Sequence, residues 1–97
     1  MVILSFADPA TEDVFHGRRT VRVFRLPPNV RRSAERKLDM LNAAHDLTDL
    51  RCPPGNRLES LQGNLWGCHS LRVNKQWRLV FRWTPLGATQ VALVDYH

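Results

Sequence analysis

The sequence has little cysteine, very little lysine and no long apolar run. Cys52 and Cys68 are its two cysteines, and no Cys-x-x-Cys spacing occurs, so neither a disulfide framework nor a cysteine-rich zinc site is expected. No apolar stretch approaches the roughly 20 residues that a membrane span needs. Residues 1–6 lack the basic start of a secretory signal. We therefore expect a cytoplasmic protein with reduced thiols and no membrane contact.

Several motifs that carry common chemistries are also missing. There is no glycine-rich phosphate loop, nucleophile elbow or dinucleotide fingerprint, so no nucleotide cofactor is expected. His69, His97 and the two cysteines are residue types that bind metals, but none of them has the spacing of paired ligands. Inert or buried thiols explain the cysteines better. We expect neither a metal ion nor a cofactor.

What the sequence does have is positive charge. Fourteen Lys and Arg face nine Asp and Glu, which gives a net charge of +5, and twelve of the fourteen are Arg. A basic domain favours a polyanionic partner, either nucleic acid or an acidic protein, and the planar guanidinium suits phosphate. The charge balance does not choose between these partners. A length of 97 residues fits one domain, residues 1–97, with one core.

Residues 77–83 form the clearest strand. Large apolar residues alternate there with Arg78, Val80 and Arg82, so one face belongs in a core and the other carries two guanidiniums. An amphipathic core strand with a solvated face is the simpler interpretation of this strand taken alone. A function needs other residues to converge on the arginine face.

The first half of the chain predicts a strand and two helices. Residues 2–6 are rich in strand formers, and Asp8 can cap a short helix that Gly17 ends. Pro27 and Pro28 open a longer helix from Asn29 to about His45, with a buried stripe at three- to four-residue spacing. Residues 18–26 fit a strand, a loop or a frayed helix equally well.

The second half reads as strands joined by tight turns. Asp46 can cap one further helical turn, and residues 52–56 form a loop. Strands are predicted at residues 57–61, 67–73, 77–83 and 89–95, with turns at 74–76 and 85–87. Helices followed by a meander of antiparallel strands indicate an α+β fold, with the helices packed on one sheet face.

The last three residues, Asp95, Tyr96 and His97, follow a strand that should anchor them. RNA cleavage without a metal needs a base for the ribose 2′-hydroxyl, an acid for the leaving 5′-oxygen, and cations around the phosphate. His97 and Asp95 offer proton transfer, and Tyr96 or an exposed Trp offers base stacking. Phosphate contacts would come from three arginines, namely Arg72, Arg78 and Arg82. A terminal histidine without a role is the alternative.

Several segments form a recognisable combination: residues 37–44, 46–51 and 53–59, then 70–79 with the sequence NKQWR at 74–78, and the terminal VDYH at 94–97. Together these segments resemble the HigB toxins of bacterial type II toxin–antitoxin systems. The resemblance implies a RelE/ParE-like fold of two N-terminal helices packed on a twisted antiparallel sheet. It also implies a metal-independent endoribonuclease that cleaves messenger RNA in the ribosomal A site. Its partner would be a HigA-type helix-turn-helix antitoxin, through which alone it would reach operator DNA.

The resemblance also implies site residues. Asp95, Tyr96 and His97 match the family's C-terminal active site, and Arg78 matches its sheet arginine. Gln62 stands where many relatives have lysine, which removes one cation from the expected phosphate site. The set expected to bind RNA is therefore Arg57, Gln62, Arg72, Lys75 and Arg82.

Two other functions remain open from the sequence. Because Gln62 stands in place of that lysine, a non-enzymatic toxin of the ParE type, which inhibits gyrase by protein binding, is an alternative. Charge alone is compatible with a plain RNA- or DNA-binding module. That last interpretation leaves the histidine end unexplained.

Overall fold

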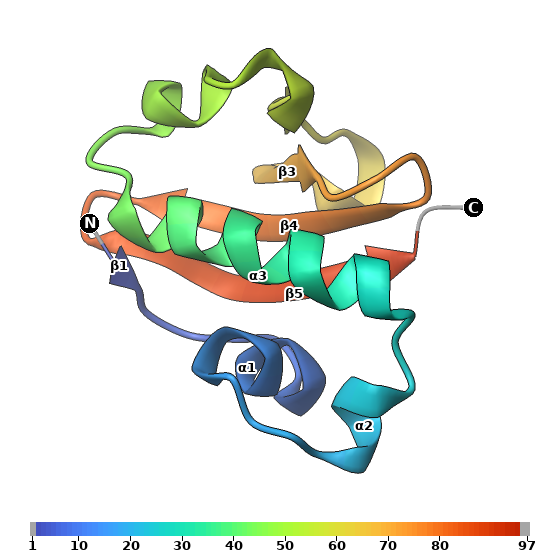
Figure 1. Ribbon diagram of the computed structural model, residues 1–97. Helices are drawn as coiled ribbons and strands as arrows, with labels where there is room; N and C mark the ends of the chain where they lie inside the picture. The colour runs from blue at the N-terminus through green and yellow to red at the C-terminus, as the bar shows by residue number, and fades with distance from the viewer. Residues whose placement is uncertain (1, 96–97) are drawn as a thin grey trace.

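The computed structural model describes residues 2–95 and has an α+β architecture (Figure 1). The described chain contains helices α1 (Pro9–His16), α2 (Val21–Phe24) and α3 (Pro28–Ala43). Its strands are β1 (Val2–Ile3), β2 (Glu59–Ser60), β3 (Cys68–Arg72), β4 (Trp77–Thr84) and β5 (Gly87–Asp95). Three 3-10 turns, η1 (Leu47–Arg51), η2 (Pro54–Asn56) and η3 (Gly63–Leu65), lie between α3 and β3.

Both predicted helices form, and their ends follow the capping signals. Asp8 accepts the backbone N–H of Thr11 at 2.7 Å, Pro9 occupies the first turn, and Gly17 ends α1 in the left-handed region with φ 69°. Helix α3 begins at Pro28 and ends at Ala43, close to the predicted bounds. The predicted turn after it is confirmed as η1, where Asp46 and Asp49 form a capping box.

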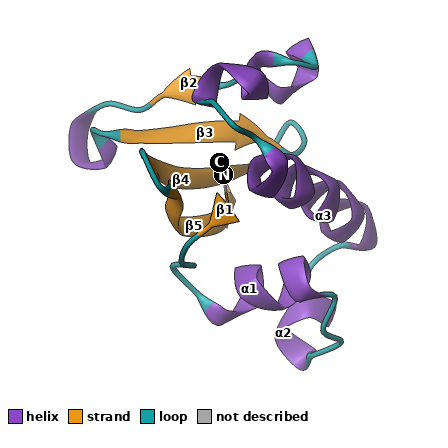
Figure 2. Ribbon diagram, turned by 90° about the vertical axis from the view of Figure 1, so that its left-hand side faces the viewer, coloured by secondary structure: helices purple, strands orange, loops and turns teal. Residues whose placement is uncertain are grey.

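The core lies between α3 and the sheet. The predicted apolar stripe is confirmed, because Val30, Ala34, Leu38 and Leu41 are all at most 2% exposed. Across from them, Leu79 and Phe81 of β4 are completely buried, as their alternation with Arg78 requires. Helices α1 and α3 lie on the same side of the sheet (Figure 2). The opposite side, which we call the open face, takes the even-numbered side chains of β3 and β4.

The sheet is mixed, which corrects the expectation of an antiparallel one. Strands β2, β3, β4 and β5 form the predicted antiparallel meander, but β1 pairs in parallel with β5, giving the order β1-β5-β4-β3-β2. Phe6 adds an isolated parallel bridge to Val91. Beyond that bridge, the edge of β5 is met by α1, where the hydroxyl of Thr11 accepts the Leu93 N–H at 2.9 Å. The N-terminal segment and α1 together therefore cover this edge.

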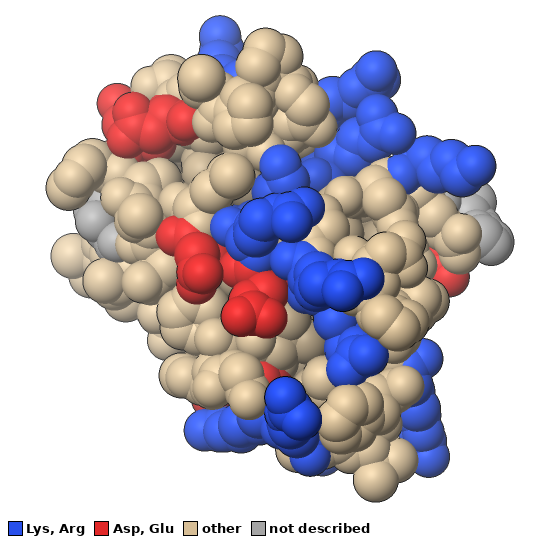
Figure 3. Space-filling model, viewed as in Figure 1, with Lys and Arg blue, Asp and Glu red and all other residues tan. Residues whose placement is uncertain are grey.

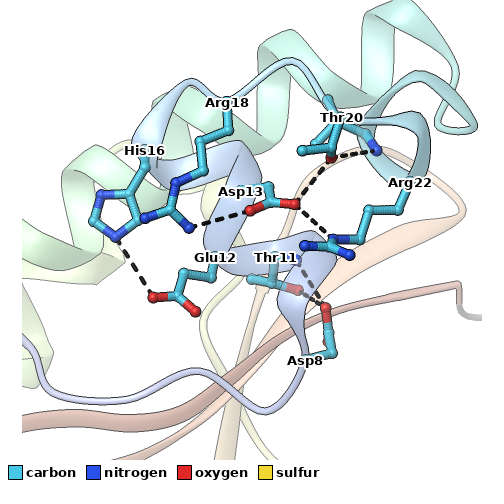
Figure 4. Close-up of polar contacts among 9 residues, drawn as sticks. Asp8, Thr11, Glu12, Asp13, His16, Arg18, Thr20 and Arg22 are labelled. Carbon is cyan, nitrogen blue, oxygen red and sulfur yellow. Dashed lines mark hydrogen bonds and ion pairs between the residues drawn. The ribbon is translucent and has the colours of Figure 1, made fainter.

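A third helix, the short α2, stands where the sequence left the structure open. A buried carboxylate, Asp13, fixes it: the side chain is 2% exposed and accepts hydrogen bonds from Arg18, Thr20 and Arg22 at 3.2, 2.9 and 2.6 Å (Figure 4). Burial by itself raises the pKa of Asp13, but the hydrogen bonds from Thr20, Arg22 and Arg18 outweigh it and hold that pKa below its usual value. The ionised carboxylate thus ties α1 to the start of α2.

Candidate functional site: an arginine cluster on the open face

Arg78 lies on the central strand β4, one residue from its start, on the open face. Its Cα partners are Arg72 on β3 and Val94 on β5, so these three side chains form one row across the sheet. The strand alternation turns Arg78 away from the buried Leu79, as the sequence predicted. The side chain of Arg78 is nonetheless only 14% exposed.

The Arg78 guanidinium is held by groups on β2 and β3. Its Nε donates to the hydroxyl of Ser70 at 2.9 Å, and its Nη2 donates to the carbonyl of Arg57 at 2.7 Å. The Glu59 carboxylate lies 3.5 Å from the same Nη2. Two rigid hydrogen bonds and one ion pair therefore fix the plane of this guanidinium before any ligand arrives.

Arg72 lies directly across from Arg78. Like charges at opposing positions of neighbouring strands repel each other, so this pair is unfavourable unless an anion lies close to it. Glu59, placed opposite Ser70 on β2, supplies one carboxylate. Two guanidiniums beside one exposed carboxylate leave an excess positive charge, and an anionic ligand would relieve it.

Asp95 stands on the strand next to Arg78 but not on its face. Asp95 pairs with Trp77, whose side chain packs against the core, so the Cβ atoms of Asp95 and Arg78 start from opposite faces. The Asp95 carboxylate accepts a hydrogen bond from the Gln76 amide at 3.2 Å. The last strand adjoins β4, as the predicted meander requires. The register nevertheless places Arg78 and Asp95 on opposite faces of the sheet. Tyr96 and His97 lie outside the described residues.

The residues expected to bind RNA are spread around this cluster. Arg57 is exposed in a left-handed conformation, φ 43°, at the end of η2. Gln62 precedes η3 and Lys75 lies in the β3–β4 turn, and both are exposed. Arg82 reaches the loop after η3, because a Cβ on Gly67 would lie 2.9 Å from its Nη1. The adjacent Trp66 is 73% exposed.

Cys52, Cys68 and His69 are not brought together as a metal-ligand set, and His97 lies outside the described residues. Among residues 2–95, no group of three or more His, Cys, Asp and Glu side chains is placed to hold a metal ion. Cys52 is exposed and Cys68 is buried, and both are free thiols. His69 faces Ser60, with 3.3 Å between Nδ1 and Oγ, and burial lowers the pKa of its imidazole.

No helix within residues 2–95 is long and apolar enough to cross a membrane.

Sequence reasoning missed Ser70 and Glu59, the two side chains that hold Arg78. A small buried serine and an exposed glutamate carry no motif, and a predicted strand over residues 57–61 did not include its pairing. The register of β2 against β3 sets Glu59 opposite Ser70, and a prediction of that register would have identified both residues.

Comparison with known proteins agrees with the arrangement. The sequence is 45% identical over 94 residues to Toxin HigB-1 of Vibrio cholerae, covering 97% of this chain and 96% of that protein. It is 42% identical over 59 residues to an uncharacterized protein of Haemophilus influenzae, covering 61% of this chain and 58% of that one.

Residues 4–97 match the family described as HigB-like toxin, the RelE-like toxin of the type II toxin–antitoxin system HigB. The match covers nearly the whole chain and gives no support to the gyrase alternative. The chain therefore belongs to the HigB-like family of RelE-like toxins, the messenger-RNA-cleaving toxins of type II toxin–antitoxin systems.

Proposed function

We propose that this toxin cleaves messenger RNA on the ribosome, in the A site, by metal-independent acid–base chemistry at the open face. The observation that carries the proposal is the pair Arg72 and Arg78, facing each other across β3 and β4 with Arg78 already oriented. Opposed guanidiniums suit a phosphodiester, because its charge grows in the transition state. The family membership supports the same substrate.

In this mechanism the ribose 2′-oxygen attacks the phosphorus and the bond from phosphorus to the 5′-oxygen breaks. A base takes the 2′-hydroxyl proton, and an acid gives a proton to the leaving 5′-oxygen. On the family resemblance, Asp95, Tyr96 and His97 are the candidates for these two tasks; Tyr96 and His97 are the stronger ones, because the Cβ of Asp95 starts from the face opposite to Arg78. Arg78 would stabilise the charge on the phosphoryl oxygens.

The message itself would lie along the remaining cations. We propose phosphate contacts from Arg57, Arg72, Lys75 and Arg82, and a polar contact from Gln62. Arg82 reaches the loop that carries the exposed Trp66, so a base stacked on that indole would place its phosphate near this arginine. Glutamine in place of lysine at position 62 leaves the other cations to supply the charge.

As a type II toxin, the protein acts with an antitoxin partner. We propose that this partner is of the HigA type, with a helix-turn-helix domain, and that the toxin reaches operator DNA only through it. Cleavage on translating ribosomes would place the protein in the cytoplasm.

The test is a cleavage assay with purified toxin, a defined message and ribosomes. We expect cuts in phase with the codon in the A site, and none in the same message without ribosomes. The upstream fragment should end in a 2′,3′-cyclic phosphate, the product of attack by the 2′-oxygen. Fragments with 3′-hydroxyl and 5′-phosphate ends would rule out the proposed chemistry, and equal cutting of naked RNA would rule out the ribosome requirement.

Two substitutions test the residues. Arg78→Ala and His97→Ala should each lower the cleavage rate by about 10²- to 10⁴-fold and relieve growth arrest. Circular dichroism shows whether each variant remains folded. Wild-type cleavage rates in both folded variants would remove these residues from the mechanism.

A further inference from the structure

A second group of arginines lies on the helical side of the molecule. A groove of about 500 Å³ opens between α1, α2 and the first half of α3. Its floor is apolar, with the buried Val14 and Val23, and arginines line it from the α1–α2 loop and from α3. Figure 3 shows Lys and Arg side chains spread over this face of the molecule. We call it the α1–α3 groove.

Three of these arginines have no carboxylate partner within the part of the chain that the structure describes. Arg18 is paired with Asp13, but Arg19, Arg31 and Arg32 make no ion pair with any residue from 2 to 95. Arg31 stacks over the ring of Phe24, 5.0 Å from its centroid, and its Nε is shielded from water without an acceptor among those residues. Because this Nε has no exposed surface, a ligand would meet Arg31 through the part of its side chain that lines the groove.

Apolar side chains stand beside these charges. Phe24 is 54% exposed and Val21 is 71% exposed, although both belong to a short helix that Asp13 holds firmly in place. An exposed aromatic next to fixed arginines is the composition of a protein–protein hot spot. The groove therefore offers apolar burial and charge pairing together.

We propose that the α1–α3 groove is where the antitoxin docks. The docking segment would place Asp or Glu side chains against Arg19, Arg31 and Arg32, and one large apolar side chain over Val14 and Val23. The inference rests on the type II toxin–antitoxin family and not on the cutting mechanism. It names the surface and the chemistry of the partner, which the family match leaves open.

RNA fits the same groove poorly. Its floor is aliphatic, with Val14 and Val23, and offers nothing to a phosphodiester. The groove also lies on the helical side, whereas the Arg72 and Arg78 pair lies on the open face. A space of about 500 Å³ accepts a few side chains but not a nucleic-acid duplex.

The experiment measures affinity between purified toxin variants and the full-length antitoxin encoded with the toxin, by calorimetry at two salt concentrations. We expect Arg19→Glu and Arg32→Glu each to weaken binding about 10- to 100-fold, and Phe24→Ala to weaken it about 10-fold. The losses from charge reversal should shrink at high salt. Arg51→Glu, an equal charge change on the exposed turn η1, is the matched control and should stay within about twofold.

A rescue experiment makes the assignment specific. Replacing one acidic antitoxin residue at a time by lysine should identify a position that restores binding to Arg32→Glu and weakens binding to the wild type. Growth arrest by the variants without antitoxin shows that they are folded and active. This readout separates a failure of the docking proposal from a failure of the cleavage proposal.

Two results would overturn the docking site. One is affinity for the antitoxin in Arg19→Glu and Arg32→Glu equal to that of Arg51→Glu. The other is unchanged antitoxin affinity with weakened ribosome binding and reduced growth arrest, which would assign the groove to ribosomal RNA.

Discussion

The Nε of Arg78 donates to the hydroxyl of Ser70 at 2.9 Å, and Ser70 is completely buried. A buried hydroxyl on the neighbouring strand therefore sets the direction of the Arg78 guanidinium on the open face. Arg78 can present its remaining nitrogen edge to a phosphate without reorganising, which is the condition for strong electrostatic stabilisation.

We predict that Ser70→Ala lowers the rate of message cleavage by roughly 10- to 100-fold, because Arg78 loses one of its two fixed hydrogen bonds. The free energy of unfolding should fall by about 1–3 kcal/mol. Ser33→Ala is the matched control. Ser33 lies on α3, and its hydroxyl donates to the Val73 carbonyl at 2.8 Å and not to Arg78. Denaturant unfolding and cleavage assays on both variants check this. A drop in cleavage of equal size in Ser33→Ala would show that lost stability, and not Arg78 orientation, is responsible.

A second prediction separates the backbone of Arg57 from its side chain. Arg57→Gly keeps the carbonyl that accepts from Arg78 and relieves a left-handed conformation, φ 43°, that favours glycine. The free energy of unfolding should stay within about 1 kcal/mol of the wild type. Cleavage should fall only several-fold, through one lost phosphate contact, and this difference should narrow at high salt. Cleavage that matches the wild type at low salt would remove the Arg57 side chain from the RNA site.

The third prediction concerns pH. Because hydrogen bonds lower the pKa of Asp13 in the folded protein, its ionised form contributes stability above its usual pKa, and this contribution is lost as pH falls through the lowered value. Asp13→Asn should lower Tm by more than about 5 °C at neutral pH, since it weakens the contacts to Arg18 and Arg22.

Thermal unfolding of both proteins across the acid range measures this. The difference in Tm should be constant near neutrality and shrink below the usual pKa of aspartate. A difference that grows as the solution becomes more acidic would contradict the assignment of the carboxylate as the stabilising species.

The fourth prediction concerns the parallel pairing of β1 with β5. Gly87 has φ 149°, and a Cβ placed there would lie 2.1 Å from the Val2 carbonyl oxygen. Gly87→Ala should therefore displace β1 from β5 and lower the free energy of unfolding by about 2 kcal/mol or more. Gly55→Ala meets nothing within 4 Å and should change it by less than about 0.5 kcal/mol. Denaturant unfolding of both variants decides, and equal stability would show that β1 tolerates the clash.

Local patterns predicted most of the fold. The caps at Asp8 and Asp46 and the apolar stripe of α3 act within a few residues, and the two-residue alternation of β4 is strong enough to locate its buried face. The parallel pairing of β1 was missed because its partners, Gly87 and Ala88, are more than 80 residues away and no local signal specifies them.

The candidate site was predicted in part for the same reason. Arg78 and Arg72 could be named from alternation and resemblance, but the groups that hold Arg78 depend on the register of β2 against β3. Asp13 carries no sequence signal that separates it from an ordinary acidic residue near a helix start. Its burial depends on Arg18, Thr20 and Arg22, in a segment whose conformation the sequence left open.

The pairing of β1 with β5 has a consequence for synthesis of the protein. Strand β1 pairs with Gly87 and Ala88, and Phe6 pairs with Val91, so residues 2–6 cannot take their places in the sheet until residues 87–91 have left the ribosome. A nascent chain that still holds residues 87–95 inside the exit tunnel lacks β5, the strand that flanks Arg78 on one side. The sheet around Arg78 is therefore completed only after residues 87–95 have been made and have left the ribosome.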